Sequence, residues 1–253
     1  FMDPADPDRV QSDPMWQPMQ DYLSGLVADL PARPRAILLV SGHWEAADFT
    51  VHVGDRPPLL FDYHGFPPHT YQLRWDAPGA PDVARRAADL LRGGGFTTRE
   101  ETARGWDHGV FIPMKVALPD ADIPLAQLSL RRDLDPAVHI AAGRALAPLR
   151  DEGVLIIGSG MSFHNLRVRG PQAIAPSTAW DYALTAAATD ADPDQRAARV
   201  AAWADLPHAR FAHPREEHLL PLMVALGAGD RSPATCTHRS SVLGWTVSGY
   251  RFG

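Results

Sequence analysis

Two apolar runs in the chain each lead into a short polar segment that contains a histidine. The stretch Ala36–Glu45 is apolar in its first half and then reads Ser-Gly-His43-Trp-Glu. The run Gly153–Gly158 is followed at once by Ser159 and a few residues later by His164. Continuous apolar runs of this kind are typical of buried parallel strands, and in open α/β sheets the ligand site lies outside the carboxyl ends of the strands. We therefore expect His43 and His164 to lie at one edge of a sheet.

The rest of the hydrophobic pattern changes between helical and strand periodicity, which favours an α/β fold. The alternation in one strand, residues 49–53, predicts that His52 is a surface residue. No repeat or linker divides the chain, so we predict a single α/β domain over residues 1–253. Its central sheet is expected to be mixed and mostly parallel, with helices on both faces. Helical spacing covers residues 15–30, 81–92, 110–118, 135–149, two segments within 177–205 and a segment from 214. Strand patterns cover 49–53, 71–75, 124–130, 235–239 and 245–252, and the last two strands are expected to finish the sheet.

The composition is that of an ordinary globular protein. Hydrophobic residues make up 45% of the chain and charged residues 21%, and a net charge of -6 gives no basis for binding nucleic acid or an anionic membrane. No apolar run approaches the roughly 20 residues that cross a bilayer, and the start of the chain lacks the pattern of a signal peptide. The single cysteine, Cys236, excludes an internal disulfide. We therefore expect a cytoplasmic protein.

Two further histidines lie at predicted helix entrances. Asp107-His108 stands between glycines before the helix 110–118, where a helix N-terminus favours an anion such as a developing oxyanion. Asp107 is equally well explained as the cap of that helix. Glu217 and His218 fall in the first turns of the last predicted helix. Because neighbouring side chains on a helix diverge by about 100°, we expect only one of these two to face the site.

A proline-rich segment, residues 57–69, carries several aromatic side chains as well as His64 and Phe66. Such loops commonly form the wall or lid of a pocket, and aromatic residues mixed with a few polar ones suit a flat apolar ligand. The alternative is an ordered surface loop that is packed by its own aromatic side chains.

Four histidines, His43, His108, His164 and His218, are the strongest candidates for chemistry. The chain has no Walker A loop, no Gly-x-Gly-x-x-Gly after a strand, no nucleophile elbow and no His-Glu-x-x-His. Histidine is the commonest metal ligand, and a metal needs only two or three. The pattern therefore favours a metal site, and the alternative for His43 is a histidine that caps a strand through hydrogen bonds.

Five motifs follow one another along the chain. They are Ser-Gly-His43-Trp, the Gly65-Phe66-Pro67 loop with Tyr71 and Ala77-Pro78-Gly79, Asp107-His108-Gly109, Ser159-Gly160 through His164-Asn165-Leu166, and Glu217-His218-x-x-Pro221-Leu222. This ordered set resembles the DODA-type, LigB-like class III extradiol ring-cleaving dioxygenases. The resemblance covers nearly the whole length. It implies a single-domain α/β fold and a non-haem Fe(II) site, in which Zn(II) can take the place of iron.

The resemblance also implies roles for individual residues. His43 and His218 match metal ligands, His164 matches the catalytic acid/base, and His108 matches a second catalytic histidine that contacts the substrate and the developing oxyanion. The third metal ligand of the family is a histidine in a His-Gly-x-x-Pro motif that ends its first strand, and we expect that strand and ligand upstream of Phe1. The residues expected to bind the substrate are Asp107, Ser159, His64, Phe66 and Tyr71.

The predicted reaction is the insertion of O2 into a catechol-type ring beside the diol, with ring opening. A small aromatic diol and O2 are the expected partners, and a homo-oligomer is left open. A histidine of near-neutral pKa is suited to taking a catechol proton and returning one to the product. A zinc-dependent hydrolase on the same ligands is one alternative. A non-catalytic binding protein with a degraded metal site is the other.

Overall fold

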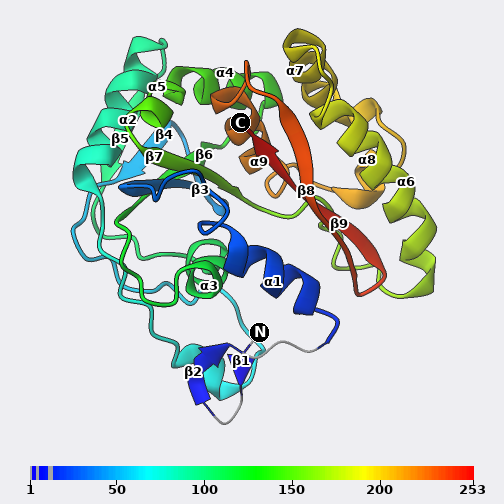
Figure 1. The fold of residues 1–253 in the computed structure, drawn as a ribbon, viewed down its shortest axis with the longest axis horizontal. Coiled ribbons are helices and arrows are strands. Elements are labelled where there is room, and N and C mark those ends of the chain that lie inside the picture. Colours follow the sequence, from blue (N-terminus) through cyan, green and yellow to red (C-terminus); the bar gives the residue numbers. More distant parts are fainter. Residues whose placement is uncertain (1, 4–5, 11–13) are drawn as a thin grey trace.

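Five strands form the central sheet, in the order β5-β4-β6-β3-β7 (Figure 1). The computed structural model describes residues 2–3, 6–10 and 14–253. Strand β3 is parallel to both of its neighbours, β6 and β7, whereas β4 is antiparallel to β6 and parallel to β5. The predicted mixed, mostly parallel sheet is therefore confirmed. The strands are β3 (Ala36–Ala46), β4 (Phe49–His52), β5 (Thr98–Glu101), β6 (Leu125–Arg131) and β7 (Val154–Ser159).

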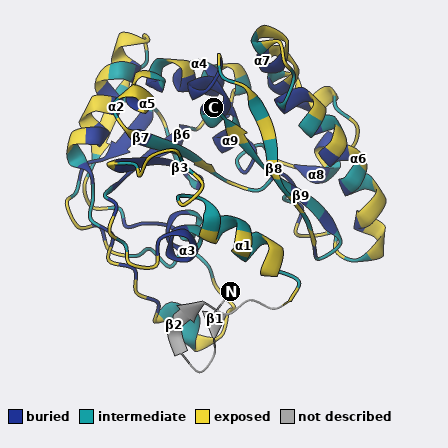
Figure 2. Cartoon of the chain, viewed as in Figure 1, coloured by how far each residue is buried: buried dark blue, intermediate teal, exposed yellow. Residues whose placement is uncertain are grey.

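Helices cover both faces of the sheet, as expected for strands that are apolar on both sides. Leu38 and Val40 of β3 face a core shared with α2, α4 and α9, and Ile37 and Leu39 pack on the other side against α3 (Figure 2). The helices are α1 (Gln17–Gly25), α2 (Pro81–Gly93), α3 (His108–Ala117), α4 (Pro136–Leu146), α5 (Pro148–Asp151), α6 (Pro171–Ala188), α7 (Pro193–Ala201), α8 (Ala209–Ala212) and α9 (Leu220–Ala228), with 3-10 turns at Pro68–Tyr71 and Trp203–Asp205.

The two C-terminal strands do not complete the central sheet, contrary to expectation. Strands β8 (Ala234–Val242) and β9 (Trp245–Phe252) form an antiparallel hairpin that packs against α6. A second small hairpin joins β1 (Met2–Asp3) and β2 (Asp6–Val10). The predicted strand 71–75 is also wrong, because that segment is a 3-10 turn followed by irregular backbone. Strand β5 was not predicted, since its residues Thr-Arg-Glu-Glu carry no apolar pattern.

His52 is buried rather than exposed, which corrects the expectation from the strand pattern. Its side chain is 1% exposed, and its ring lies 5.2 Å from that of Trp106. The alternation along β4 places His52 on the opposite face from Val51, but that face is covered by the loop that carries Trp106. A polar residue in a strand is thus no evidence of solvent contact when a loop covers its face.

Two glycines let β7 and the segment after it lie directly against the turn that enters α9. A Cβ at Gly160 would lie 2.1 Å from the carbonyl oxygen of His218, and a Cβ at Gly158 would lie 2.2 Å from that of Pro221. Because backbone atoms cannot move aside as a flexible side chain can, both positions require glycine. The position of His218 beside the sheet therefore depends on these two residues.

We expect Gly160→Ala to lower the free energy of unfolding by about 1–3 kcal/mol, because the new methyl group forces two backbones apart. Gly93→Ala is the matched control, since a Cβ there meets no atom within 4 Å. That variant should be unchanged or more stable by up to about 1 kcal/mol. Urea unfolding measures both, and equal stability of the two variants would contradict the close approach.

Candidate metal centre

The parallel pairing of β3 and β7 brings the two predicted polar segments to one edge of the sheet. Ser41 lies opposite Ser159 in the ladder, so the chains leave the shared core side by side. His43 follows on β3, and the segment after β7 carries His164. Both histidines line the same cavity. The two histidines thus lie at one edge of the sheet, as we expected from the ends of the apolar runs.

His43 and His218 face each other through their Nε2 atoms, which are 3.2 Å apart. His218 lies in the turn before α9 and not inside a helix, because the helix begins at Leu220. Imidazole nitrogens bind zinc at about 2.0–2.1 Å, so two of them on one tetrahedral ion lie roughly 3.3 Å apart. The observed separation therefore fits two ligands of a common metal ion.

Glu217 fixes the orientation of His218. Its Oε1 atom is 2.9 Å from Nδ1 of His218. Burial alone would raise the pKa of Glu217, but the hydrogen bond with His218 and the charge of Arg215 lower it to about 2. Because an ionised carboxylate only accepts, Nδ1 of His218 is the donor and Nε2 keeps its lone pair for a metal. Only one of the two adjacent residues thus offers its atom to His43.

His164 stacks on His218, with ring centroids 3.3 Å apart and planes 16° apart. Its backbone N–H donates to the carbonyl of Ala212 and so holds the segment after β7 in place. Burial, together with the nearby His218, lowers the pKa of His164 to about 3. The imidazole is therefore neutral near pH 7, but its pKa lies below the near-neutral value that suits a general base.

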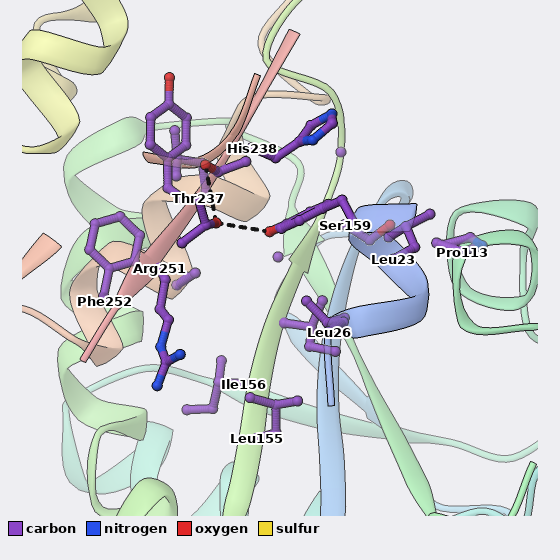
Figure 3. A pocket seen from close by; sticks show the side chains of 18 of the residues that line it. Leu23, Leu26, Pro113, Leu155, Ile156, Ser159, Thr237, His238, Arg251 and Phe252 are labelled. Atoms are coloured by element: carbon purple, nitrogen blue, oxygen red, sulfur yellow. Dashed lines mark hydrogen bonds between the residues drawn. The ribbon is translucent and has the colours of Figure 1, made fainter. Parts of the chain in front are cut away.

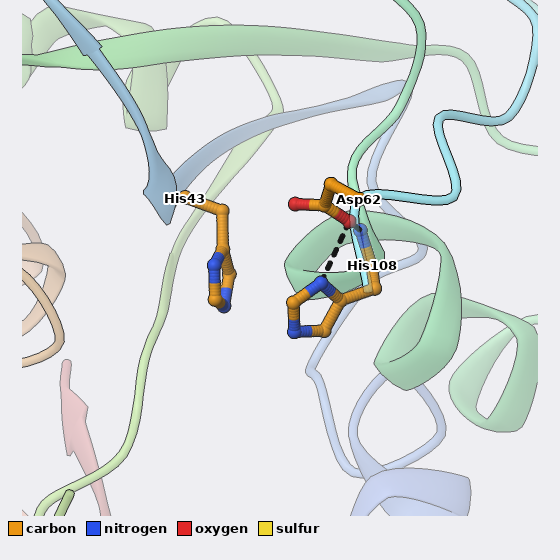
Figure 4. A group of neighbouring side chains, drawn as sticks. All are labelled: His43, Asp62 and His108. Carbon is orange, nitrogen blue, oxygen red and sulfur yellow. Dashed lines mark hydrogen bonds and ion pairs between the residues drawn. The ribbon is translucent and has the colours of Figure 1, made fainter. Parts of the chain in front are cut away.

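His108 approaches His43 from the first turn of α3, and their ring centroids are 3.9 Å apart (Figure 4). Asp62 lies behind it: its Oδ1 atom accepts the backbone N–H of His108 at 3.0 Å and is 2.7 Å from Nδ1. Burial raises the pKa of Asp62, but the hydrogen bonds from His108 outweigh it and lower the pKa overall. The ionised carboxylate thus holds the proton of His108 on Nδ1.

Sequence reasoning missed Asp62. It lies within the aromatic loop among residues with no helical or strand period, so no pattern related it to His108. Its position before the Gly65-Phe66-Pro67 motif was the only available signal. Among the described residues, two groups have possible ligand atoms that all lie within 4.8 Å of one another: His43-Asp62-His108, to which Asp62 belongs, and His164-Glu217-His218.

Asp107 is fully buried, and its carboxylate accepts hydrogen bonds from three side chains of the protein. Oδ1 accepts from Ser41 Oγ at 2.7 Å, and Oδ2 accepts from Gln127 Nε2 at 2.6 Å and from Arg104 at 3.2 Å. It precedes α3 without capping it through its side chain. Asp107 therefore joins β3, β6 and α3, and the structure does not bring its carboxylate to the cavity.

The remaining expected substrate residues are spread over the aromatic loop and the end of β7. Ser159 lines the cavity and donates its hydroxyl to the carbonyl of Gly109 in α3. Tyr71 packs against Tyr63, whose ring lies edge-on to His108 with centroids 5.6 Å apart. Phe66 is 59% exposed and contacts Tyr63, and His64 is exposed. Tyr63 is thus the aromatic side chain of the loop that contacts His108, next to Asp62.

A cavity of about 1010 Å³ opens beside β7 and is lined by the four candidate histidines. Figure 3 shows another part of its wall, where Ser159 of β7 lies across from Thr237 and His238 of the C-terminal hairpin. Its walls include the consecutive residues 153–162 at β7 and 247–253 at β9. Because side chains alternate along a strand, a lining of consecutive residues means that the cavity follows the edges of both strands. Within the described residues β7 pairs only with β3, and β9 pairs only with β8. Two open strand edges therefore face one cavity. 

The site thus gathers four imidazoles and two carboxylates at the ends of strands, the arrangement of a candidate metal-dependent enzyme of the α/β class. Comparison with known proteins defines the family. Residues 7–253 match the family model described as the catalytic LigB subunit of aromatic ring-opening dioxygenase. The chain belongs to this family of ring-opening dioxygenases, which confirms the resemblance drawn from its motifs.

Individual relatives agree with this membership. The chain is 42% identical over 214 residues to a 4,5-DOPA dioxygenase extradiol of Beta vulgaris, covering 82% of this chain and 78% of the relative. It is 39% identical over 242 residues to dioxygenase tasH of Hapsidospora irregularis, covering 89% and 74%. The crystal structure of the uncharacterized protein JW3007 from Escherichia coli K12 matches with a TM-score of 0.80 and 29% identity, over 96% of this chain and 95% of that one.

Among the described residues, no helix is long and apolar enough to cross a membrane.

We expect Asp107→Ala to lower the free energy of unfolding by about 2–4 kcal/mol, because the buried Ser41 and Gln127 and the partly buried Arg104 lose their acceptor. Asp133→Ala is the control, since Asp133 is paired with Arg131 but its side chain is 43% exposed. The control should lose less than about 1 kcal/mol. If urea unfolding shows Asp107→Ala to be as stable as the control, the carboxylate is not the junction described here.

Proposed function

We propose that the chain is a non-haem Fe(II)-dependent extradiol dioxygenase that opens the ring of a catechol-type substrate with O2, and that residues 1–253 act as one catalytic domain. The observation that carries the proposal is the approach of His43 and His218 through their Nε2 atoms at 3.2 Å. Two more imidazoles, His108 and His164, stand beside this pair and are the proposed groups for proton transfer. The family membership supplies the class of reaction.

His43 and His218 are the proposed metal ligands. Burial, together with the nearby His108 and His218, lowers the pKa of His43 to about 4, so its imidazole is neutral and available near pH 7. A bound Fe(II) with open positions supplies a template on which a catecholate and O2 meet, and it carries electrons between them. Zn(II) suits the same nitrogen ligands but undergoes no redox change.

The third protein ligand is proposed to come from an extended segment that occupies the cavity beside β7. Open edges of β7 and β9 face that space, and its volume of about 1010 Å³ has room for a strand. A strand parallel to β7 would end at the same sheet edge as His43, because parallel strands share the direction of their carboxyl ends. This fits the histidine that the family resemblance puts at the end of such a strand.

His164 is the proposed acid/base. Its imidazole lies in the cavity next to His218, where we propose that it accepts the proton of a catechol hydroxyl and later returns it to an oxygen of the opened ring. His108 is the proposed second catalytic group. With its Nδ1 proton held by Asp62, the neutral ring presents Nε2 as an acceptor for a hydroxyl of the substrate. Once Nε2 has taken up a proton, the ring can donate to a developing oxyanion.

The aromatic loop is the proposed wall for the flat ring of the substrate. Tyr63, in edge-on contact with His108, is the aromatic side chain of the loop proposed to face the substrate ring. Tyr71 supports Tyr63, while the exposed His64 and Phe66 lie where a substituent of the ring would leave the site. Ser159, at the end of β7, lines the cavity. Asp107 contributes by positioning α3 and β3 instead of contacting the substrate.

The reaction itself is tested by anaerobic reconstitution with Fe(II), followed by a catechol and O2. We expect O2 consumption and a yellow ring-opened product, and no product with Zn(II) because zinc cannot exchange electrons with O2. Hydrolysis by the zinc form without O2 uptake would favour a metal-dependent hydrolase instead. Binding of the catechol without any turnover would favour a binding protein.

The two proposed roles of histidine are separated by substitution. His43→Ala should lose stoichiometric metal, whereas His164→Ala should retain the metal and lose about 10²–10⁴-fold in kcat, the usual contribution of general acid/base catalysis. Metal analysis and steady-state kinetics on the same preparations measure both quantities. Retention of stoichiometric iron by His43→Ala would show that the ligand assignment is wrong.

A further inference from the structure

Arg215 lies between the two segments that carry the proposed metal ligands. Its guanidinium binds both carboxylate oxygens of Glu45, with distances of 2.5 Å from Nη1 and 2.7 Å from Nη2. The same Nη1 atom is 3.3 Å from Oε2 of Glu217. Glu45 lies two residues after His43 on β3, and Glu217 directly precedes His218. One side chain therefore joins the neighbours of both ligands.

These contacts form a closed ring that begins and ends on β3. From Glu45 it passes through Arg215 to Glu217, whose other oxygen is 2.9 Å from Nδ1 of His218. From Nε2 of His218 it returns over 3.2 Å to Nε2 of His43. Each step is a charged or imidazole contact at short range, so a shift of Arg215 reaches the metal-facing atoms through only one intermediate side chain.

We propose that Arg215 is a positioning residue that aligns His218 with His43 and so sets the affinity of the site for a divalent metal. The inference rests on the proposed function, because it assumes that these two histidines share an ion. The planar guanidinium suits this role, since a two-pronged contact fixes direction as well as distance. A lysine at this position would offer the positive charge without the two-pronged geometry.

The exposure of the pair separates positioning from general stabilisation. The side chain of Arg215 is 50% exposed and that of Glu45 is 23% exposed. Ion pairs in such contact with solvent contribute little to global stability. Loss of a partner that orients a metal-bound histidine, in contrast, typically weakens metal binding by about 10–100-fold. Metal affinity is therefore expected to respond where unfolding does not.

The chain contains a matched control within the same segment. Arg210 pairs with Glu216 at 2.7 Å, and its side chain is 54% exposed. This ion pair resembles that of Arg215 in chemistry and exposure, but Glu216 does not adjoin a proposed ligand. Arg210→Gln thus removes an equivalent charge and contact without breaking the ring.

The test is a spectrophotometric titration of the metal-free protein with Co(II), which reports ligand binding without turnover. We expect Arg215→Gln to weaken Co(II) binding by about 10–100-fold, Arg215→Lys to give an intermediate loss, and Arg210→Gln to stay within about twofold of the parent protein. The urea midpoints of metal-free Arg215→Gln and Arg210→Gln should shift to the same small extent. If Arg215→Lys bound Co(II) with the affinity of the parent protein, the two-pronged contact of the guanidinium would not be needed.

Parent-like Co(II) binding by Arg215→Gln would overturn the positioning role, while the proposed site would stand as long as His43→Ala loses the metal. If His43→Ala also binds as the parent does, the metal site itself is refuted. Should Arg215→Gln fail to fold, Glu45→Gln opens the same contact from the strand side. That variant is expected to show the same loss of affinity, and parent-like binding by it would overturn the proposal.

Discussion

The site depends on the parallel pairing of β3 with β7 and on the close contact of β7 with the turn before α9. The ladder places Ser41 opposite Ser159, so both strands release their chains at the same edge. The absence of side chains at Gly158 and Gly160 lets the backbone around His218 lie against that edge. Three segments that are distant in sequence are therefore held together by backbone contacts. The positions of the imidazoles depend on where these backbones lie.

Much of this arrangement could be predicted from the sequence because it is encoded in periodicity. A buried parallel strand is recognisable as an apolar run, and the end of that run locates the site, which is how His43 and His164 were identified. His108 and His218 were recognised as the polar residues before apolar helices. The convergence of His43 and His164 follows from a general property of parallel sheets. The pairing of His43 with His218, in contrast, was expected from the family resemblance.

The parts that could not be predicted depend on the path of irregular segments. Asp62 reaches His108 only because the aromatic loop folds back over α3, and no local pattern specifies that path. Asp107 resembled a site residue in sequence, yet its carboxylate accepts hydrogen bonds from a buried serine, a buried glutamine and a partly buried arginine. The burial of His52 likewise depends on the loop that carries Trp106. Each case involves tertiary contacts that override local preference.

The two facing imidazoles are separated by 175 positions along the chain, which couples the ion to folding. In the unfolded ensemble a pair so distant has negligible chance of meeting, because closing a long loop is entropically unfavourable. An ion that needs both rings therefore binds the native state alone. At a free concentration of 100 times Kd, such a ligand adds roughly 2.7 kcal/mol to the free energy of unfolding. Metal binding at this site would then stabilise the association of the first and last thirds of the polypeptide.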